Sequence, residues 1–140
     1  MNRFDIKAIT VGVLSMLALD LLSGVVSFIV FSGDALKTGA SQEEISAVAR
    51  IIEQDNGYLL FGLLLGTLST IFGGYVAGRR AKQLPLFNAC AVGVLGLVAV
   101  VLLGGQSESP GWFNVIGFIS TLPAAIMGGS LAKRGIKMVG

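Results

Sequence analysis

Long apolar runs separated by short polar segments dominate the pattern of the chain. Four stretches of 22 to 24 residues, 8–31, 57–78, 84–105 and 111–132, are apolar, and three of them contain no charged residue. A helix needs about 20 apolar residues to cross the hydrocarbon core of a bilayer. The pattern therefore predicts an all-α membrane protein with four transmembrane helices.

The composition of the chain agrees with this interpretation. Hydrophobic residues make up 54% of the sequence and charged residues only 13%, whereas about 25% of the residues of a typical soluble domain are charged. A soluble fold of this size could not bury four such stretches. The linkers 79–83 and 106–110 are too short for a second domain, so residues 1–140 are expected to form a single transmembrane domain.

Basic residues predict how the chain is oriented. Eight of the ten Lys and Arg residues flank the predicted helices on one side: Arg3, Lys7, Arg79, Arg80, Lys82, Lys133, Arg134 and Lys137. Cytoplasmic loops are enriched in Lys and Arg. Both termini are therefore expected in the cytoplasm, and the loops 32–56 and 106–110 on the outer side.

The apolar stretches also resemble one another in pairs. Residues 11–24 and 92–105 are identical at eight of 14 positions, and residues 61–82 and 116–137 at seven of 22. The two hairpins that these stretches form, the first with the second and the third with the fourth, are both expected to begin on the cytoplasmic side of the membrane. The chain is thus predicted to contain two tandem helical hairpins, which form a parallel internal repeat.

Small residues recur every four positions in the second and fourth stretches. They are Gly62, Gly66, Thr70, Gly74 and Gly78 in the second and Gly117, Thr121, Ala125 and Gly129 in the fourth, with Gly73 and Gly128 beside them. Such faces allow helix backbones to approach closely in a lipid environment. We expect these two helices to form the central pair; the faces suit packing within one chain or an oligomer interface.

Asp20 is the one charged residue inside an apolar stretch, near the predicted centre of the bilayer. An ionised carboxylate there costs about 2.5–3.5 kcal/mol on insertion scales. We therefore expect Asp20 to be protonated, hydrogen-bonded or exposed to a wet cavity. It is either the proton or cation site of a transport protein, or a neutral side chain that joins helices. Candidate partners are Ser15, Ser23, Ser27, Thr67, Ser69, Thr70, Ser120 and Thr121.

The predicted outer loop 32–56 contains a helix signal of its own. Residues 41–44 read Ser-Gln-Glu-Glu, which is typical of a capping box. Apolar residues then recur on one helical face. A short amphipathic helix is predicted over 42–55, either on the outer membrane surface, as a cap on the bundle, or as a docking surface for a partner.

Catalytic and metal-binding residue types are scarce. The chain has no His, and Cys90 is its single cysteine. This composition excludes an intrachain disulfide, zinc or haem ligation by His, and Ser-His or Cys-His nucleophiles. We expect no metal, no cofactor, no enzymatic activity and no nucleic-acid partner.

The stretch GGYVAGRRAK at 73–82, echoed at 128–137, resembles a helix ending of small uncharacterised bacterial four-helix inner-membrane proteins. That resemblance implies a multi-pass protein of a bacterial cytoplasmic membrane. Four spans with an acid in the first also resemble the small multidrug-resistance transporters. The aromatic residues that those transporters place around their acid have no recognisable counterpart here.

Two functions fit these observations. The first is a helix-packing accessory or assembly protein without catalytic chemistry, which contacts the bilayer and forms a homo-oligomer or part of a larger membrane complex. The alternative is a proton-coupled small-molecule transporter or channel that works as a homo-oligomer through Asp20.

Overall fold

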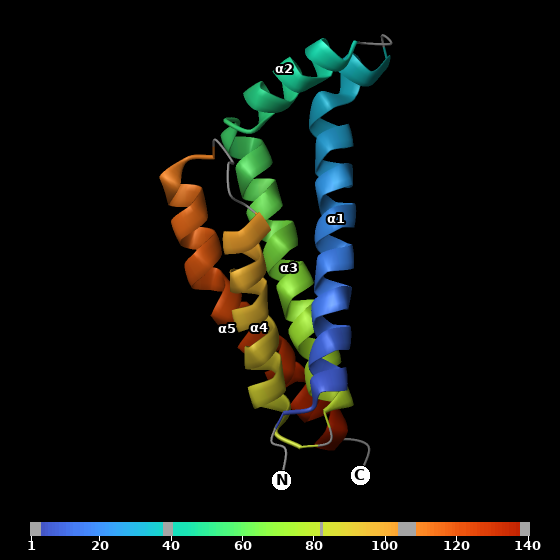
Figure 1. Ribbon diagram of the computed structural model, residues 1–140, viewed down its shortest axis with the longest axis vertical. Helices are drawn as coiled ribbons and strands as arrows, with labels where there is room; N and C mark the ends of the chain where they lie inside the picture. Colours follow the sequence, from blue (N-terminus) through green and yellow to red (C-terminus); the bar gives the residue numbers. More distant parts are fainter. Residues whose placement is uncertain (1–3, 38–40, 82, 104–108, 138–140) are drawn as a thin grey trace.

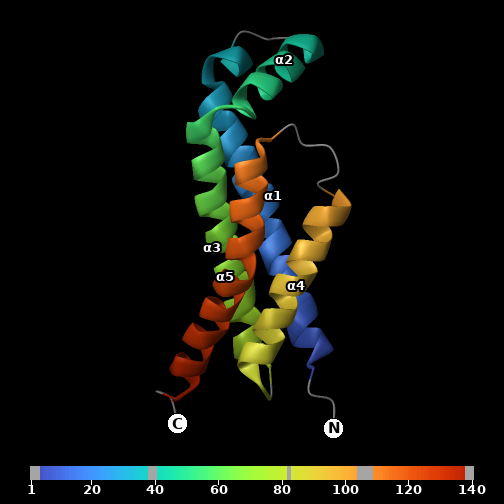
Figure 2. The same cartoon turned by 90° about the vertical axis from the view of Figure 1, so that its left-hand side faces the viewer.

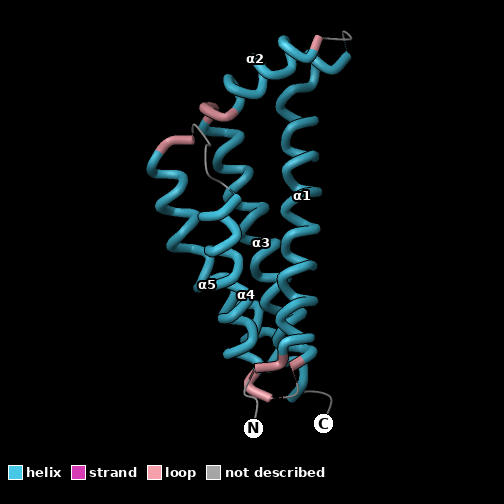
Figure 3. The backbone as a smooth tube through the Cα atoms, viewed as in Figure 1, coloured by secondary structure: helices cyan, strands magenta, loops and turns pink. Residues whose placement is uncertain are grey.

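Helices account for almost all of the backbone in the computed structural model, which describes residues 4–37, 41–81, 83–103 and 109–137 (Figure 3). The described residues form five helices and no strand: α1 (Ile6–Lys37), α2 (Gln42–Ile52), α3 (Asn56–Arg80), α4 (Pro85–Leu103) and α5 (Gly111–Lys137) (Figure 1). All but α2 are long and apolar enough to cross a membrane. The chain is thus a small multi-pass membrane protein whose apolar helices contact the lipid bilayer.

The membrane-spanning helices extend beyond the apolar stretches. Helix α1 runs from Ile6 to Lys37, whereas the predicted transmembrane stretch was 8–31. Helix α5 continues to Lys137, beyond the predicted end at 132. Hydropathy marks the part of a helix that lies in hydrocarbon, whereas the backbone hydrogen bonds continue into the polar flanks. The predicted end of the third stretch, at 104–105, lies outside the described residues.

Helix α2 connects the far ends of α1 and α3 (Figure 1). Its capping box is confirmed: the Ser41 hydroxyl accepts the Glu44 N–H at 3.3 Å, and the Glu44 carboxylate accepts the Ser41 N–H at 2.8 Å. The helix ends at Ile52 instead of the expected 55. The reason is that Asp55 caps α3, where its carboxylate accepts the Tyr58 N–H at 2.8 Å.

At the opposite end, a fully buried amide joins the start of α1 to the connection between α3 and α4. The Asn88 side-chain oxygen accepts the Asp5 N–H at 2.8 Å. Its amide nitrogen donates to the carbonyl oxygens of Gln83 and Leu84, at 3.0 and 3.1 Å. Leu84 has a φ of 49°, a left-handed conformation. Because a buried polar group is costly without partners, these bonds hold the turn and the first residues of α1 together.

The same end contains the closest helix contacts. Helices α3 and α5 share the most extensive interface, as expected for the central pair, and α3 also contacts α1 and α4. A β-carbon on Gly73 would lie 2.9 Å from the Gly12 carbonyl oxygen of α1, and one on Gly78 would lie 3.1 Å from Gly129 of α5. Glycine is therefore what allows these backbones to approach so closely.

The helices separate toward the end that carries α2. Figure 1 shows α1 and α5 diverging in that direction, and Figure 2 shows α5 changing direction along its length. Pro123 lies inside α5, where its ring removes a backbone hydrogen bond and favours a bend. Among the described residues, no atom of another helix lies within 4 Å of the position that a β-carbon on Gly62 or Gly66 would take. We refer to the two halves of the bundle as the closed end, with the N-terminus of α1, and the open end, with α2.

The contact between α3 and α5 should tolerate no side chain at its tightest point. A β-carbon on Gly128 would collide with the Ile71 carbonyl oxygen and lie 2.7 Å from the Tyr75 amide nitrogen. Gly128→Ala should therefore lower the free energy of unfolding by about 1–3 kcal/mol, the usual range for overpacking. Unfolding in mixed micelles of mild detergent and SDS, followed by circular dichroism, measures the change.

Gly24→Ala is the matched control for this prediction, because in the part of the chain that the structure describes no atom of another helix lies within 4 Å of the position that a methyl group on Gly24 would take. The control should stay within about 1 kcal/mol of the wild type, the scale of the helix propensity difference. Equal stability of the two variants would contradict the close contact between α3 and α5.

Candidate functional site

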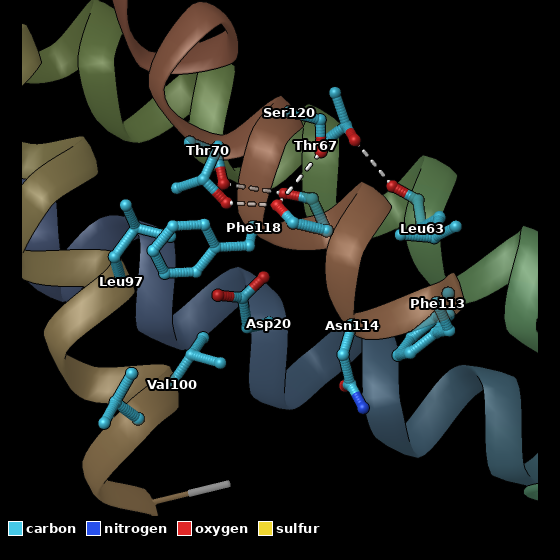
Figure 4. A pocket seen from close by; sticks show the side chains of 15 residues that line it. Asp20, Leu63, Thr67, Thr70, Leu97, Val100, Phe113, Asn114, Phe118 and Ser120 are labelled. Carbon is cyan, nitrogen blue, oxygen red and sulfur yellow. Dashed lines mark hydrogen bonds between the residues drawn. The ribbon is translucent and has the colours of Figure 1, made fainter. Parts of the chain in front are cut away.

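The separation of the helices at the open end leaves a cavity around Asp20. The cavity has a volume of about 730 Å³ and is lined by α1, α3, α4 and α5. Asp20 is the residue that α1 contributes, and it also lines two smaller cavities of about 320 and 170 Å³. Figure 4 shows its carboxylate pointing from α1 into the space between the other helices. Asp20 was expected to be protonated, hydrogen-bonded or exposed to a cavity, and in the structure it both accepts a hydrogen bond and lines a cavity.

The hydrogen bond to Asp20 comes from the buried hydroxyl of Ser69 on α3. Ser69 has a second acceptor in reach, the Gly66 carbonyl oxygen of its own helix at 2.9 Å. A hydroxyl carries one proton and can also accept. When Asp20 is ionised, Ser69 can donate to it; when Asp20 is protonated, Ser69 can accept from it and donate to Gly66. Both protonation states of Asp20 therefore find a partner.

Further hydroxyls line the cavity from α3 and α5. Each donates its proton to a carbonyl of its own helix: Thr67 to Leu63 at 2.7 Å, Thr70 to Gly66 at 2.8 Å, Ser120 to Gly117 at 3.1 Å and Thr121 to Gly117 at 2.7 Å (Figure 4). Their remaining hydrogen-bonding capacity is that of oxygen lone pairs. The cavity thus offers acceptors, with a carboxylate among them.

Apart from the side-chain amide of Asn114 on α5, the rest of the wall is apolar. Helix α4 contributes aliphatic side chains, among them Leu97 and Val100, and α5 adds Phe113 and Phe118. None of the described residues that line the cavity is a Lys or an Arg. A single acid, a set of hydroxyl oxygens and an apolar wall make this an electronegative site with a hydrophobic side.

The two predicted small-residue faces divide at this cavity. Six of their members lie in close helix contacts at the closed end: Gly73, Gly74, Gly78, Ala125, Gly128 and Gly129. The other five line the cavity: Gly62, Gly66, Thr70, Gly117 and Thr121. A four-residue spacing shows that side chains share a face, but the crossing angle of the helices decides how far along that face they touch.

Sequence reasoning missed three residues that matter here. Asn114 lines the cavity from α5, and Asn88 holds the closed end together. Each is the only residue with a side-chain amide in its apolar stretch. An isolated polar residue of this kind could have marked both positions, as the isolated acid marked Asp20. Phe118 carried no such signal, because an aromatic residue in an apolar helix is equally suited to face lipid.

Comparison of the chain with protein-family models, with curated proteins and with solved structures found no match. Its class rests on the helices themselves: the described residues contain four long apolar helices, and these support a small four-span membrane protein.

A hydrophobic carbodiimide should modify Asp20 in the folded protein. A protonated carboxyl adds across one C=N bond of dicyclohexylcarbodiimide. The reaction is an addition without a leaving group, so the product contains every atom of both reactants. Because Asp20 faces a cavity with an apolar wall, its labelling should increase as the pH is lowered and the carboxyl becomes neutral. Mass spectrometry of the peptide that contains Asp20 measures the labelled fraction.

Asp20→Asn provides the control for this labelling and should remove the modification at position 20, which fragmentation of the peptide distinguishes from any modification at Asp34. Protein unfolded in SDS shows the maximal labelling of the same peptide. If Asp20 in the folded wild type remained unmodified at every pH while the unfolded chain reacted, the cavity would not be accessible to small molecules.

Proposed function

We propose that this chain is a membrane transport protein in which Asp20 holds either a proton or a cationic substrate within the cavity at the open end. The observation that carries the proposal is the position of the Asp20 carboxylate: it lies midway along a membrane-spanning helix and lines a cavity of about 730 Å³. Acids inside membrane helices are costly and usually mark ion or proton pathways. The proposal involves no catalytic chemistry.

The surroundings of Asp20 favour a binding site over a purely structural link. An acid that only joins two helices gains by having its acceptor sites filled with hydrogen bonds from neighbouring side chains. Among the described residues, Ser69 is the one side chain that donates to Asp20. The remaining hydrogen-bond acceptor sites of the Asp20 carboxylate therefore face the cavity and are available to a bound ligand. Ser69 can donate to Asp20 or accept from it, as Asp20 loses or gains a proton.

The direction in which the cavity opens follows from the basic residues. Lys7, Arg79, Arg80, Lys133 and Arg134 lie on helix segments at the closed end. Since cytoplasmic ends collect such residues, we infer that the closed end faces the cytoplasm and that the membrane is a bacterial cytoplasmic membrane. In this conformation the cavity then opens toward the outer side.

A transport cycle also needs the site to close on that side. Gly62 and Gly66 of α3 line the cavity opposite Gly117 and Thr121 of α5. These small residues continue the face that is already packed at the closed end. We propose that the outer half of α5 swings toward α3 about Pro123 and closes the cavity by extending the same kind of contact.

The tandem repeat bears on the number of copies. Within the proposed repeat, the position equivalent to Asp20 is Val101, so one chain supplies one carboxylate. A second acid comes only from a second copy. We propose a homo-oligomer in which each subunit holds one cation site built on its own Asp20.

An assembly role is the second candidate, because the outer half of α1 is poorly covered. Leu21, Leu22 and Val25 are more than half exposed, at 74%, 60% and 57%. Another membrane helix could pack on this face as well as lipid can. Native mass spectrometry from mild detergent distinguishes the two roles: a different membrane protein retained in fixed proportion supports assembly, whereas copies of this chain alone support the transport proposal.

Cation-driven proton movement tests the transport proposal. Proteoliposomes with an acidic interior and an internal pH dye receive an outside pulse of potassium, tetramethylammonium or 4-phenylbutylguanidinium, all of which keep their charge. Wild-type protein should exchange internal protons for at least one of these ions, so that the interior becomes less acidic. Asp20→Asn should reduce this exchange to the rate of protein-free liposomes.

Asp55→Asn is the matched control, because it makes the same chemical change outside the cavity and Asn also caps helices well. It should exchange protons like the wild type. Proton movement that is the same in wild type and Asp20→Asn, or no movement with any of the three ions, would refute the proposal.

The orientation is tested separately with fusions at three positions. Green fluorescent protein attached after Gly140 or before Met1 should fluoresce in a bacterial host, since it folds in the cytoplasm. Alkaline phosphatase inserted in the loop 32–56 should be active, since it needs export. The reverse activities, or termini on opposite sides, would contradict the inferred orientation.

A further inference from the structure

We propose that the cavity selects hydrophobic monovalent cations that carry N–H donors, such as an arylalkyl guanidinium or ammonium ion. This inference names the substrate class of the site proposed above and therefore rests on that function. Three features of the cavity lining lead to it: its charge, its hydrogen-bonding character and its apolar side.

The charge of the lining favours one positive charge. Asp20 is the one acid among the described residues that line the cavity, and no described lining residue is basic. A monovalent cation neutralises the ionised carboxylate. A divalent cation leaves a net charge in a low-dielectric site, and an anion adds to the charge already there, so both are disfavoured.

The hydroxyls favour a cation with N–H groups. Thr70 and Thr121 each donate to a carbonyl of their own helix, at 2.8 and 2.7 Å, so toward the cavity they act as acceptors. A guanidinium or ammonium ion satisfies such acceptors, whereas a quaternary ammonium has no N–H to offer. A hydrogen bond that involves a charged group strengthens binding by about tenfold or more.

The remaining wall favours an organic body over an inorganic ion. The cavity of about 730 Å³ falls in the range of small-molecule sites, which are mostly apolar with a few convergent polar groups. Leu97 and Val100 cover one side, and the rings of Phe113 and Phe118 are available to an aromatic group or to a cation over the ring. An inorganic ion would leave this apolar surface without a partner.

Proton and cation compete for Asp20 in this arrangement. The groups that face Asp20 are hydroxyls from α3, aliphatic side chains from α4, and hydroxyls and the Asn114 amide from α5; none of these described groups titrates near neutral pH. The affinity for a permanently charged ligand should therefore fall as the pH is lowered and Asp20 becomes protonated.

Ligand binding to the purified wild-type protein in mild detergent tests the inference. Trp112 is the only tryptophan of the chain, and its ring lies 6.1 Å from that of Phe113, so its fluorescence should report on the cavity. The three probes share one apolar body: 4-phenylbutylguanidinium, 4-phenylbutyl-trimethylammonium and 4-phenylbutanol. We expect the guanidinium to bind at least about tenfold more tightly than either of the others, given the hydrogen-bond contribution.

Hydroxyl variants assign that preference to the cavity without touching Asp20. Thr70→Val and Thr121→Val keep the side-chain shape and remove one acceptor each. Each should weaken guanidinium binding severalfold and leave trimethylammonium binding unchanged. Thr10→Val is the matched control: its hydroxyl also donates to its own helix, to Ile6 at 2.8 Å, but it is exposed and outside the cavity.

Each result separates the ligand class from the transport function. Equal binding of the guanidinium and trimethylammonium probes overturns the N–H requirement, and equal binding of the alcohol overturns the cationic class. Tight guanidinium binding without proton exchange in liposomes supports the ligand class and refutes transport. Asp20-dependent exchange of potassium without guanidinium binding supports transport and refutes the ligand class.

Discussion

Direct contact between helix backbones at the closed end determines the rest of the architecture. Gly73 meets Gly12 of α1, and Gly74, Gly78, Gly128 and Gly129 bring α3 against α5. Lipid is as apolar as leucine, so helices in a bilayer gain little from burying large aliphatic side chains and associate where small residues permit close packing. Stiff helices that cross at one level must separate at another. The cavity at the open end is therefore a geometric consequence of the contact at the closed end.

This geometry explains why an acid is tolerated in the middle of α1. Asp20 lies just beyond the level where the helices touch, and it meets a serine on one side and a cavity on the other. Had the small-residue contacts continued along the whole of α3, the carboxylate would have been enclosed among apolar side chains at a considerable cost. The stability of the bundle and the presence of a candidate binding site thus depend on the same division of α3 into a packed half and an open half.

The elements could be predicted from the sequence far better than the site. Apolar length alone predicts the four spanning helices, and the residue pattern Ser41 to Glu44 predicts the start of α2 through its capping box. Asp20 stands out because its burial is costly, and Ser69 was among its candidate partners. Whether Gly66 and Gly74 line a cavity or pack against another helix could not be predicted in the same way. They share one helix face, and only the crossing of α3 with its neighbours places one in a cavity and the other in a contact.

Water access along α3 tests this division most directly. With Cys90 replaced by alanine, single cysteines are placed at Thr67 in the cavity, at Leu68 on the lipid-facing side and at Ala77 in the closed end. A charged, membrane-impermeant thiol reagent is then added to the protein in lipid vesicles. We predict rapid modification at position 67 and little at 68 or 77. Equal rates at positions 67 and 68, or no reaction at 67, would contradict a cavity that opens to water around Asp20.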